Sequence, residues 1–186
     1  MSRIHVIQPE EATGQLKEIY NELIENRGKI AEVHKIQSLR PKSIVKHMDL
    51  YLEIMFSKSE LSRAEREMMA VIVSVNNECD YCRLHHGEAL NHYWKDQEKI
   101  NRLINNFQDA GLSDRQLALC YFARELTINP GNFEDDSRIE WLKEKEFGDQ
   151  AVLDATLVVS YFNFVNRMVL ALGVEANEDE IKGYKF

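Results

Sequence analysis

Two cysteines and a histidine lie close together in the middle of the sequence, at helical spacing. Cys82 follows Cys79 by three residues and His86 follows Cys82 by four, so the three side chains share one face if a helix begins near Cys79. A cysteine near a helix N-terminus faces unpaired N–H groups and the positive end of the helix dipole, which lower the pKa of its thiol. A neighbouring imidazole supplies a proton acceptor. The pattern therefore predicts a reactive thiol pair with an acid–base residue beside it.

A glutamate in the preceding segment is placed to join this group. If two helices form an antiparallel hairpin that turns near Asn77, Glu67 lies ten positions before the turn and His86 nine after it. At a rise of about 1.5 Å per residue, both stand roughly 14 Å from the turn and face each other. A carboxylate beside a histidine orients the ring and raises its basicity. We therefore predict a relay from Glu67 through His86 to Cys82, with Cys79 as the disulfide partner.

Two other interpretations of the cysteine pair remain open, namely packed core cysteines and a zinc site. Cys79, Cys82, His85 and His86 together offer the four ligands that a tetrahedral zinc site needs. However, adjacent residues on a helix point about 100° apart, so one helix does not easily close a tetrahedron with His85 and His86. We therefore favour the redox pair. His85 is then expected at the surface, with the mouth of the pocket as the less favoured alternative. Tyr81 could screen the site or donate a hydrogen bond to a bound peroxide, but neither role is favoured.

The other candidate residues have no such companions in the sequence. Cys120 has apolar neighbours and is expected to be a small core residue. Glu65 and Arg66, which directly precede Glu67, are expected to be solvated charges. Ordinary surface or core positions are expected for the remaining histidines, His5, His34, His47 and His92.

The composition indicates a globular chain and excludes some functions. The 186 residues are 44% hydrophobic and 29% charged, which is typical of a folded domain. The net charge of −8 argues against a nucleic-acid partner, since that class of protein needs a basic surface. The N-terminus lacks the apolar core of a signal peptide, and no apolar run approaches membrane-spanning length, so no membrane partner is expected. We expect a cytoplasmic protein, whose cysteines are kept reduced.

Helical periodicity runs through nearly the whole chain, and no stretch alternates like a strand, so we predict an all-α fold. Capping residues mark several helix starts, including a capping box at residues 62–65, and Gly173 is a plausible helix stop. Because the apolar helix at 149–172 is apolar nearly all round, we expect it to lie at a subunit contact. The tail at 175–186 is polar. The expected helices are 9–27, a short one before Pro41, 42–56, 62–76, 79–94, 96–107, 113–128, 135–146 and 149–172.

The spacing Glu-x11-Cys-x2-Cys-x3-His, formed by Glu67, Cys79, Cys82 and His86, resembles the active-site pattern of the AhpD-like, carboxymuconolactone decarboxylase-like superfamily. The wider chain is similar to the peroxidase-related branch of that superfamily, and the resemblance is strongest over residues 59–94. AhpD itself carries a histidine between the cysteines, where this chain has Asp80-Tyr81. Further similar segments are 112–116, 123–127 and 161–167.

This resemblance implies an all-α bundle built on antiparallel helix hairpins, which assembles into dimers, trimers or hexamers. It also implies reduction of a peroxide or disulfide substrate, with Cys82 attacking and Cys79 resolving. The expected organisation is an N-terminal helical extension at 1–56, an AhpD-like core at 57–130, and C-terminal helices at 131–186 that complete the same domain.

The favoured hypothesis is a thiol-dependent antioxidant oxidoreductase in which His86, oriented by Glu67, moves the proton. No glycine-rich phosphate loop follows a strand, so no bound cofactor is expected. Electrons should instead arrive from an external lipoyl- or thioredoxin-like dithiol. The alternatives are a carboxymuconolactone decarboxylase-like lyase, or a redox-sensing or zinc-binding oligomer without enzymatic activity.

Overall fold

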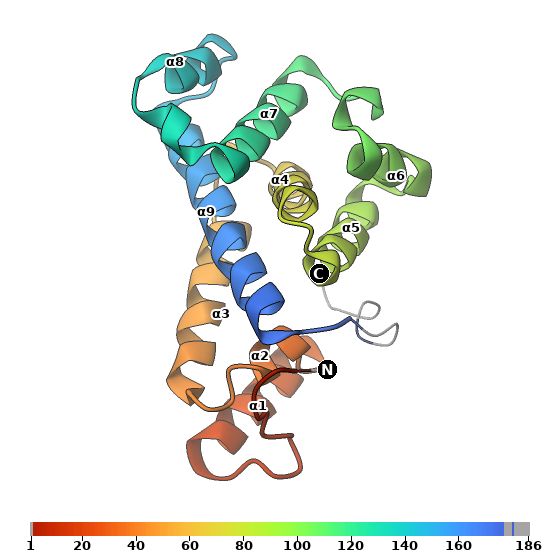
Figure 1. Ribbon diagram of the computed structural model, residues 1–186, viewed down its shortest axis with the longest axis vertical. Helices are drawn as coiled ribbons and strands as arrows, with labels where there is room; N and C mark the ends of the chain where they lie inside the picture. Colours follow the sequence, from red (N-terminus) through yellow and green to blue (C-terminus); the bar gives the residue numbers. More distant parts are fainter. Residues whose placement is uncertain (1, 177–179, 181–186) are drawn as a thin grey trace.

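Every regular element that the computed structural model describes is a helix (Figure 1). The described residues are 2–176 and 180. The all-α prediction is therefore confirmed. The elements are α1 (Gly14–Arg27), α2 (Glu32–Lys35), α3 (Pro41–Phe56), α4 (Arg63–Asn76), α5 (Asp80–Trp94), α6 (Gln97–Asn105), the 3₁₀ helix η1 (Phe107–Asp109), α7 (Asp114–Ile128), the 3₁₀ helix η2 (Pro130–Phe133), α8 (Ser137–Glu144) and α9 (Asp149–Leu172).

The α4 helix is the central element of the fold. It packs against α3, α5, α6, α7 and α9, and Figure 1 shows it enclosed by several of these helices. Its start is fixed as predicted, because the Ser62 side chain accepts the Glu65 N–H and the Glu65 carboxylate accepts the Ser62 N–H. The apolar run at residues 68–73 is wholly buried, as expected for a helix that is covered on all sides.

A tight turn joins α4 to α5 and places the first cysteine. The Cys79 N–H donates to the Ser74 carbonyl at 2.9 Å, and the Glu78 N–H donates to the Val75 carbonyl at 3.1 Å. These two bonds form the Schellman pattern, which requires a left-handed residue at Glu78, where φ is +55°. The turn reverses the chain within three residues and makes Cys79 the N-cap of α5. The expected hairpin therefore forms where the sequence placed it.

The α9 helix runs along one side of the molecule and packs against α3, α4, α7 and α8. It ends at Gly173, which adopts the left-handed conformation expected of a helix stop. Among the described residues, α9 is the one helix long and apolar enough to cross a membrane, so the expectation that no segment approaches that length is wrong. The core helix of a soluble protein can be as long and as apolar as a membrane-spanning helix. The contacts of α9 with four other helices are typical of such a core helix.

Some helix ends differ from the sequence-based boundaries. The first helix begins at Gly14 instead of Pro9, because Gly14 has φ +52° and no right-handed helix continues through it. The helix expected over 96–107 ends at Asn105, and the one expected over 135–146 spans Ser137–Glu144. The polar tail at 175–186 lies mostly outside the described residues.

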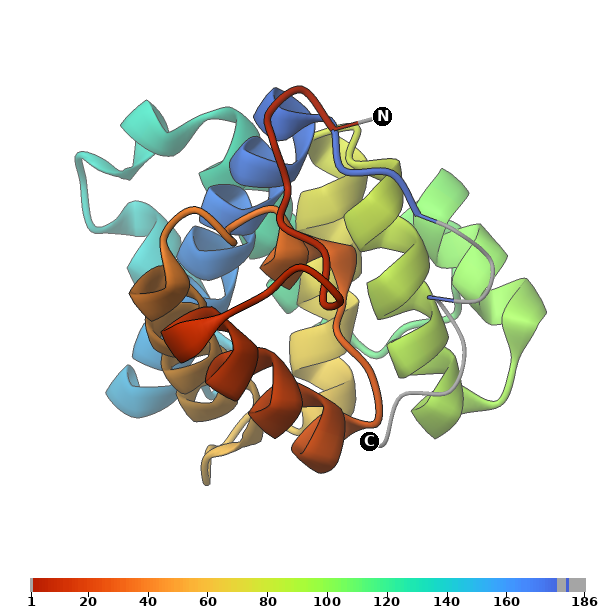
Figure 2. The same ribbon diagram turned by 90° about the horizontal axis from the view of Figure 1, so that it is seen from below.

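The N-terminal helices form a second, smaller apolar cluster. The α1 helix packs on α3, and Figure 2, seen from below, shows α1 lying across this end of the molecule. Tyr20 is the largest buried side chain there, and its hydroxyl donates to the Ile7 carbonyl at 3.0 Å. Because α3 also packs on α4 and α9, it connects this cluster to the main core.

Candidate active site

The two cysteines meet at the start of α5, and both are free thiols that are almost completely buried. Their side chains interact, and this interaction separates their pKa values. A hydrogen bond from the Cys82 side chain lowers the pKa of Cys79, against the opposing effect of burial. The same hydrogen bond, together with burial, holds the pKa of Cys82 well above its ordinary value. Cys79 is therefore the thiol of the pair that loses its proton more readily.

The structure brings Glu67 and His86 together across the α4–α5 hairpin. Glu67 Oε2 lies 2.7 Å from His86 Nδ1, and the glutamate is fully buried. This contact fixes the tautomer, because an Nδ1–H that donates to a carboxylate leaves Nε2 to accept a proton. Burial alone raises the pKa of Glu67, but the charge and hydrogen bond of His86, with those of Arg63, leave it lowered. A buried carboxylate therefore holds the imidazole in one orientation.

Arg63 completes this group, and the sequence analysis did not identify it. Its guanidinium donates to Glu67 Oε1 through Nε at 2.9 Å and through Nη2 at 2.5 Å. The same group donates to the Tyr51 hydroxyl at 3.2 Å and lies over the Phe56 ring at 3.6 Å. The available signal was the i, i+4 spacing from Arg63 to Glu67 on one helix. Arg63 thus neutralises the buried carboxylate that orients His86.

The charges beside Glu67 were only partly understood from sequence. Arg66 is not a solvated charge, because it is buried and its guanidinium donates to the carbonyls of Ile54 at 2.9 Å and Ser57 at 3.0 Å. These hydrogen bonds connect α4 to the C-terminal end of α3. Glu65 serves the capping box and an ion pair with Arg115 at 3.4 Å.

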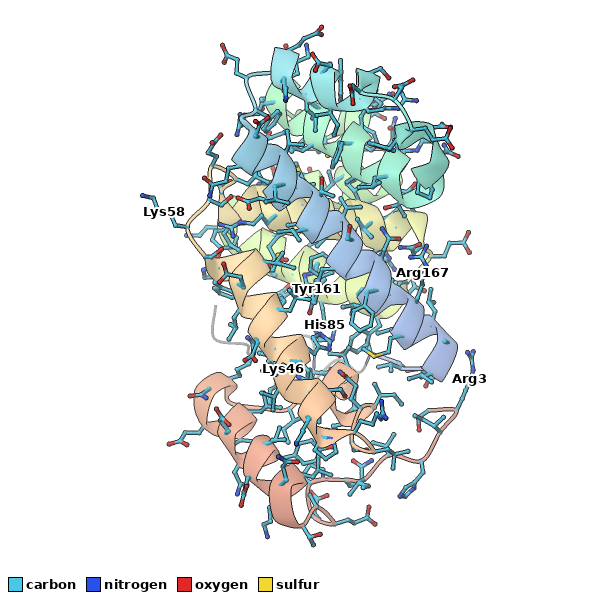
Figure 3. The ribbon with its side chains drawn as sticks, turned by 90° about the vertical axis from the view of Figure 1, so that its left-hand side faces the viewer. Arg3, Lys46, Lys58, His85, Tyr161 and Arg167 are labelled. Carbon is cyan, nitrogen blue, oxygen red and sulfur yellow. The ribbon has the colours of Figure 1, made fainter. Side chains whose placement is uncertain are left out.

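A pocket of about 90 Å³ lies against the site. Cys82 and His86 line it, whereas Cys79 is not among the described residues that do. Figure 3 looks onto α3 and α9 and labels Tyr161 and His85, which line the pocket from α9 and α5. Cys82 is therefore the sulfur that faces the pocket. The other lining residues are Arg27, Ala31, Val33, His34, His47, Tyr51, Tyr81, Ala89, Phe162 and Val165.

Three further histidines line this pocket, and the favoured sequence-based interpretation placed none of them there. The expectation of a surface position for His85 is wrong, since only 13% of its side chain is exposed. His34 and His47 are buried, with ring centroids 5.3 Å apart, and His47 lies 5.6 Å from the Tyr161 ring. Burial holds the pKa of His34 well below its ordinary value and lowers those of His47 to about 4 and His85 to about 3. These three rings are therefore neutral at pH 7.

Tyr81 forms part of the pocket wall and is anchored to other segments. Its hydroxyl donates to Glu180 Oε1 at 2.5 Å and accepts the Val33 N–H at 3.2 Å. Glu180 Oε1 also lies 3.5 Å from His85 Nε2 and accepts the Glu32 N–H. A carboxylate from the far end of the chain therefore meets Tyr81 and His85. Cys120 is a buried core residue, as expected.

The neutral pocket histidines predict a specific loss of stability in mild acid. We expect the free energy of unfolding to be highest above about pH 6.5 and to fall towards pH 4, because the unfolded chain protonates these imidazoles at their ordinary pKa whereas the folded chain does not. Each such histidine contributes a slope of up to about 1.4 kcal/mol per pH unit in that range. Urea unfolding from pH 7.5 to 4.5 measures this.

His47→Gln should make this slope shallower. The matched control is a replacement of His5, which is exposed and should leave the slope unchanged. A second loss belongs to lower pH. Because the pKa of Glu67 is lowered in the fold, its contribution is present above the unfolded pKa of about 4.3 and disappears as the pH falls through the folded value. An unfolding free energy that is level between pH 7.5 and 4.5 would contradict the neutral histidines.

In the part of the chain that the structure describes, no group of three or more His, Cys, Asp and Glu side chains is arranged to hold a metal ion. The fold and the site instead define a class of protein. An all-helical bundle with a buried dithiol at a hairpin turn, beside a histidine held by a carboxylate, has the fold and the residues that the resemblance to AhpD-like proteins implies. Comparison with known proteins agrees with this class.

Residues 44–125 match the carboxymuconolactone decarboxylase family, which confirms the recognition made from Glu67, Cys79, Cys82 and His86. The matched segment runs from the first turn of α3 into the last turns of α7 and includes the whole hairpin. None of the curated proteins matches the chain in sequence.

Solved structures resemble the fold over nearly its whole length. An uncharacterized peroxidase-related protein with an alkylhydroperoxidase AhpD core, from Ralstonia eutropha JMP134, is 24% identical, with a TM-score of 0.86 and coverage of 97% of this chain and 94% of that chain. An uncharacterized peroxidase-related protein from Silicibacter sp. TM1040 is 26% identical, with a TM-score of 0.83 and 97% coverage of both chains. The debrominase Bmp8 is 19% identical, with a TM-score of 0.76 and coverage of 95% and 96%.

Proposed function

We propose that this chain is a thiol-dependent oxidoreductase that reduces a peroxide, or the disulfide of a partner, through Cys82 and Cys79. The observation that carries the proposal is the position of Cys82, which faces the pocket beside a histidine that a buried carboxylate holds in place. A structural cysteine pair needs neither a pocket nor an oriented imidazole. The peroxidase-related relatives support the same activity.

Substrate access favours Cys82 as the attacking sulfur, whereas negative charge is favoured on Cys79. The proposed mechanism takes both facts into account. The resting charge is favoured on Cys79, but the substrate reaches Cys82. The hydrogen bond between the sulfurs lets one proton change sides, so the minor form with thiolate on Cys82 is available for attack. His86 Nε2 accepts the Cys82 proton in the alternative route. We therefore keep Cys82 as the attacking residue and Cys79 as the resolving one.

The proposed steps balance in atoms and electrons. Starting from two thiols, the Cys82 proton passes to His86, the Cys82 thiolate attacks the outer peroxide oxygen, and the O–O bond breaks. His86 gives that proton to the leaving alkoxide, so the products are Cys82 sulfenic acid and an alcohol. The Cys79 thiol then gives its proton to His86 and attacks the Cys82 sulfur, a disulfide forms, and the departing hydroxide takes that second proton and leaves as water. An external lipoyl- or thioredoxin-like dithiol supplies two electrons and two protons to restore both thiols.

The pocket favours a small substrate. A cavity of about 150 Å³ is enough to hold benzene, whereas this pocket measures about 90 Å³. We therefore propose hydrogen peroxide or a short alkyl hydroperoxide in preference to a bulky one. The same limit gives no support for the brominated ring that a variant of the debrominase Bmp8 binds, 2,3,4-tribromopyrrole. In the reducing cytoplasm, where we propose that the protein acts, dithiol reductants are available.

The test combines a thiol count with turnover. The chain has three cysteines, and stoichiometric hydrogen peroxide should remove two thiols rapidly while Cys120 stays reduced, because burial raises its pKa. Dihydrolipoamide or reduced thioredoxin should restore both thiols and support steady peroxide consumption. One zinc per chain with unreactive thiols would contradict the proposal and favour a metal site. Reversible oxidation without turnover would favour a sensor. Thiols that neither bind zinc nor react with peroxide would favour the lyase alternative.

We also propose that the chain forms a homo-oligomer through the outer face of α9. Leu153, Leu157 and Phe164 lie on one stripe of that helix and are exposed by 57%, 40% and 52%. Large apolar side chains grouped in this way are typical of a surface that another protein covers, and a second copy is the partner proposed here. Light scattering at micromolar concentration tests the assembly, and a strictly monomeric species would contradict it.

A further inference from the structure

A fully buried amide on α9 belongs to the surroundings of the cysteine pair. Asn166 has no exposed surface, and its side chain acts to lower the pKa of Cys82. Its Nδ2 also lies 3.4 Å from Ser74 Oγ, and its Oδ1 lies 3.0 Å from Asn77 Nδ2. An amide presents either a donor or an acceptor to its neighbour, depending on which way it is turned. The effect of Asn166 on Cys82 therefore depends on which end faces the sulfur.

The orientation of these amides can be traced from the surface inwards. Arg167, which Figure 3 labels on α9, is exposed and only donates hydrogen bonds, so the atom it contacts at 2.5 Å must be the oxygen of Asn163. The other end of that side chain, Nδ2, lies 3.0 Å from the Val159 carbonyl, which only accepts. The two contacts agree, so the oxygen and nitrogen of Asn163 are fixed.

The next amide follows from the first. Asn163 Oδ1 lies 3.0 Å from Asn77, so the Asn77 atom there must be its NH₂ group. That NH₂ group also lies 3.0 Å from Asn166, so the Asn166 atom facing it must be the oxygen. The NH₂ group of Asn166 therefore points towards Ser74 and Cys82. Ser74 accepts, because its own hydroxyl proton is donated to the Ala70 carbonyl at 2.7 Å.

We propose that Asn166 is a thiolate-stabilising donor to Cys82, and that the chain from Arg167 through Asn163 and Asn77 holds it in the donating orientation. The inference deepens the proposed function, on which its catalytic importance rests. Asn166 contacts the reacting sulfur, whereas Arg167, Asn163 and Asn77 are positioning residues.

The consequence concerns the proton shared by the two sulfurs. The bond to Cys79 and burial both raise the pKa of Cys82, and Asn166 is the neighbour whose hydrogen bond lowers it. Donation from Asn166 therefore shifts the pair towards the form with charge on Cys82, which is the form that faces the pocket. Without that donor, the charge would remain on the sulfur that does not line the pocket.

The test measures Cys82 reactivity directly, in a Cys79→Ser background that removes the coupling between the sulfurs. The rate of alkylation by iodoacetamide, followed from pH 6 to 10, gives the pKa of Cys82. Asn166→Asp keeps an acceptor for Asn77 but adds a negative charge, which raises the pKa of Cys82 by itself. Asn166→Leu removes the donor without adding a charge and is therefore compared with it. In both variants we expect the pKa of Cys82 to rise and the rate at pH 7 to fall by about tenfold or more. Arg167→Met should lower that rate by about two- to fivefold, because it releases the chain of amides.

The matched control is Arg102→Met, on the exposed surface of α6, which should leave the alkylation profile unchanged. Thermal unfolding of each variant separates altered chemistry from altered folding. If the Asn166 variants do not fold, the pKa of Cys82 in Arg167→Met is the result that tests the inference. An unchanged pKa of Cys82 in the folded variants would overturn the inference. A shift in Asn166→Asp without one in Arg167→Met would overturn the positioning chain. Because alkylation needs no peroxide, failure of the proposed activity would leave this result standing.

Discussion

Cys82→Ser is expected to abolish catalytic peroxide reduction, with turnover lowered by roughly a thousandfold or more. The reason is that Cys82 is the cysteine facing the pocket, so its loss removes the nucleophile, whereas Cys79 is not among the residues that line this space. Hydroxyl and thiol are close in size, so the fold should be retained. The measurement is steady-state consumption of hydrogen peroxide with dihydrolipoamide as reductant.

The partner cysteine gives a sharper second readout. Without an external dithiol, Cys79→Ser should consume one equivalent of peroxide per chain and stop at Cys82 sulfenic acid, because no disulfide closes. That acid should be trapped by dimedone and seen by mass spectrometry. Cys120→Ser is the matched control and should retain turnover, since this cysteine is enclosed in the core. Undiminished turnover by Cys82→Ser would show that the attacking sulfur is misassigned.

Glu67→Gln is expected to weaken both catalysis and the fold. Turnover should fall by about 10- to 100-fold, because the amide does not hold the His86 ring as the carboxylate does at 2.7 Å. The free energy of unfolding should fall by about 3 kcal/mol, because the Arg63 guanidinium is left without its buried counter-ion. Peroxide kinetics and urea unfolding measure the two effects separately.

A second substitution separates these two roles of Glu67. Arg63→Met together with Glu67→Gln removes both charges, so we expect the double variant to regain part of the lost stability and none of the lost activity. Glu98→Gln, on the exposed face of α6, is the matched control for both assays. If the single variant keeps full turnover, the carboxylate does not act through His86, whatever its effect on stability.

The α4–α5 hairpin could be predicted from sequence because its signals are local. The capping box at Ser62 and Glu65 fixes one end of the hairpin, and two asparagines mark the turn. With both helices defined, the rise per residue alone places Glu67 opposite His86, and the structure has that contact. Helical geometry is the same in every protein, so counting residues was enough.

The pocket walls could not be predicted in this way. Helical periodicity indicates which face of a helix is buried but does not say which helix covers it, so nothing in the sequence placed His47 or Tyr161 near Cys82. His34 and His47 were read only as ordinary histidines for this reason. The prediction for Arg66 was wrong because the sequence does not distinguish a buried arginine from a solvated arginine. The guanidinium of Arg66 is buried and donates hydrogen bonds to two backbone carbonyls.

The compactness of the reactive hairpin has a consequence for how the protein is made. Glu67 and His86 are 19 positions apart, and the cysteines lie between them, whereas Asn166 meets Ser74 across 92 positions. Contacts of short sequence separation form early in folding, and those of long separation form late. We therefore expect the two thiols to come together during synthesis before α9 has been made and closes over them. In that interval the dithiol of the newly made chain would be assembled and unshielded, so we expect oxidants to damage the protein most at that stage.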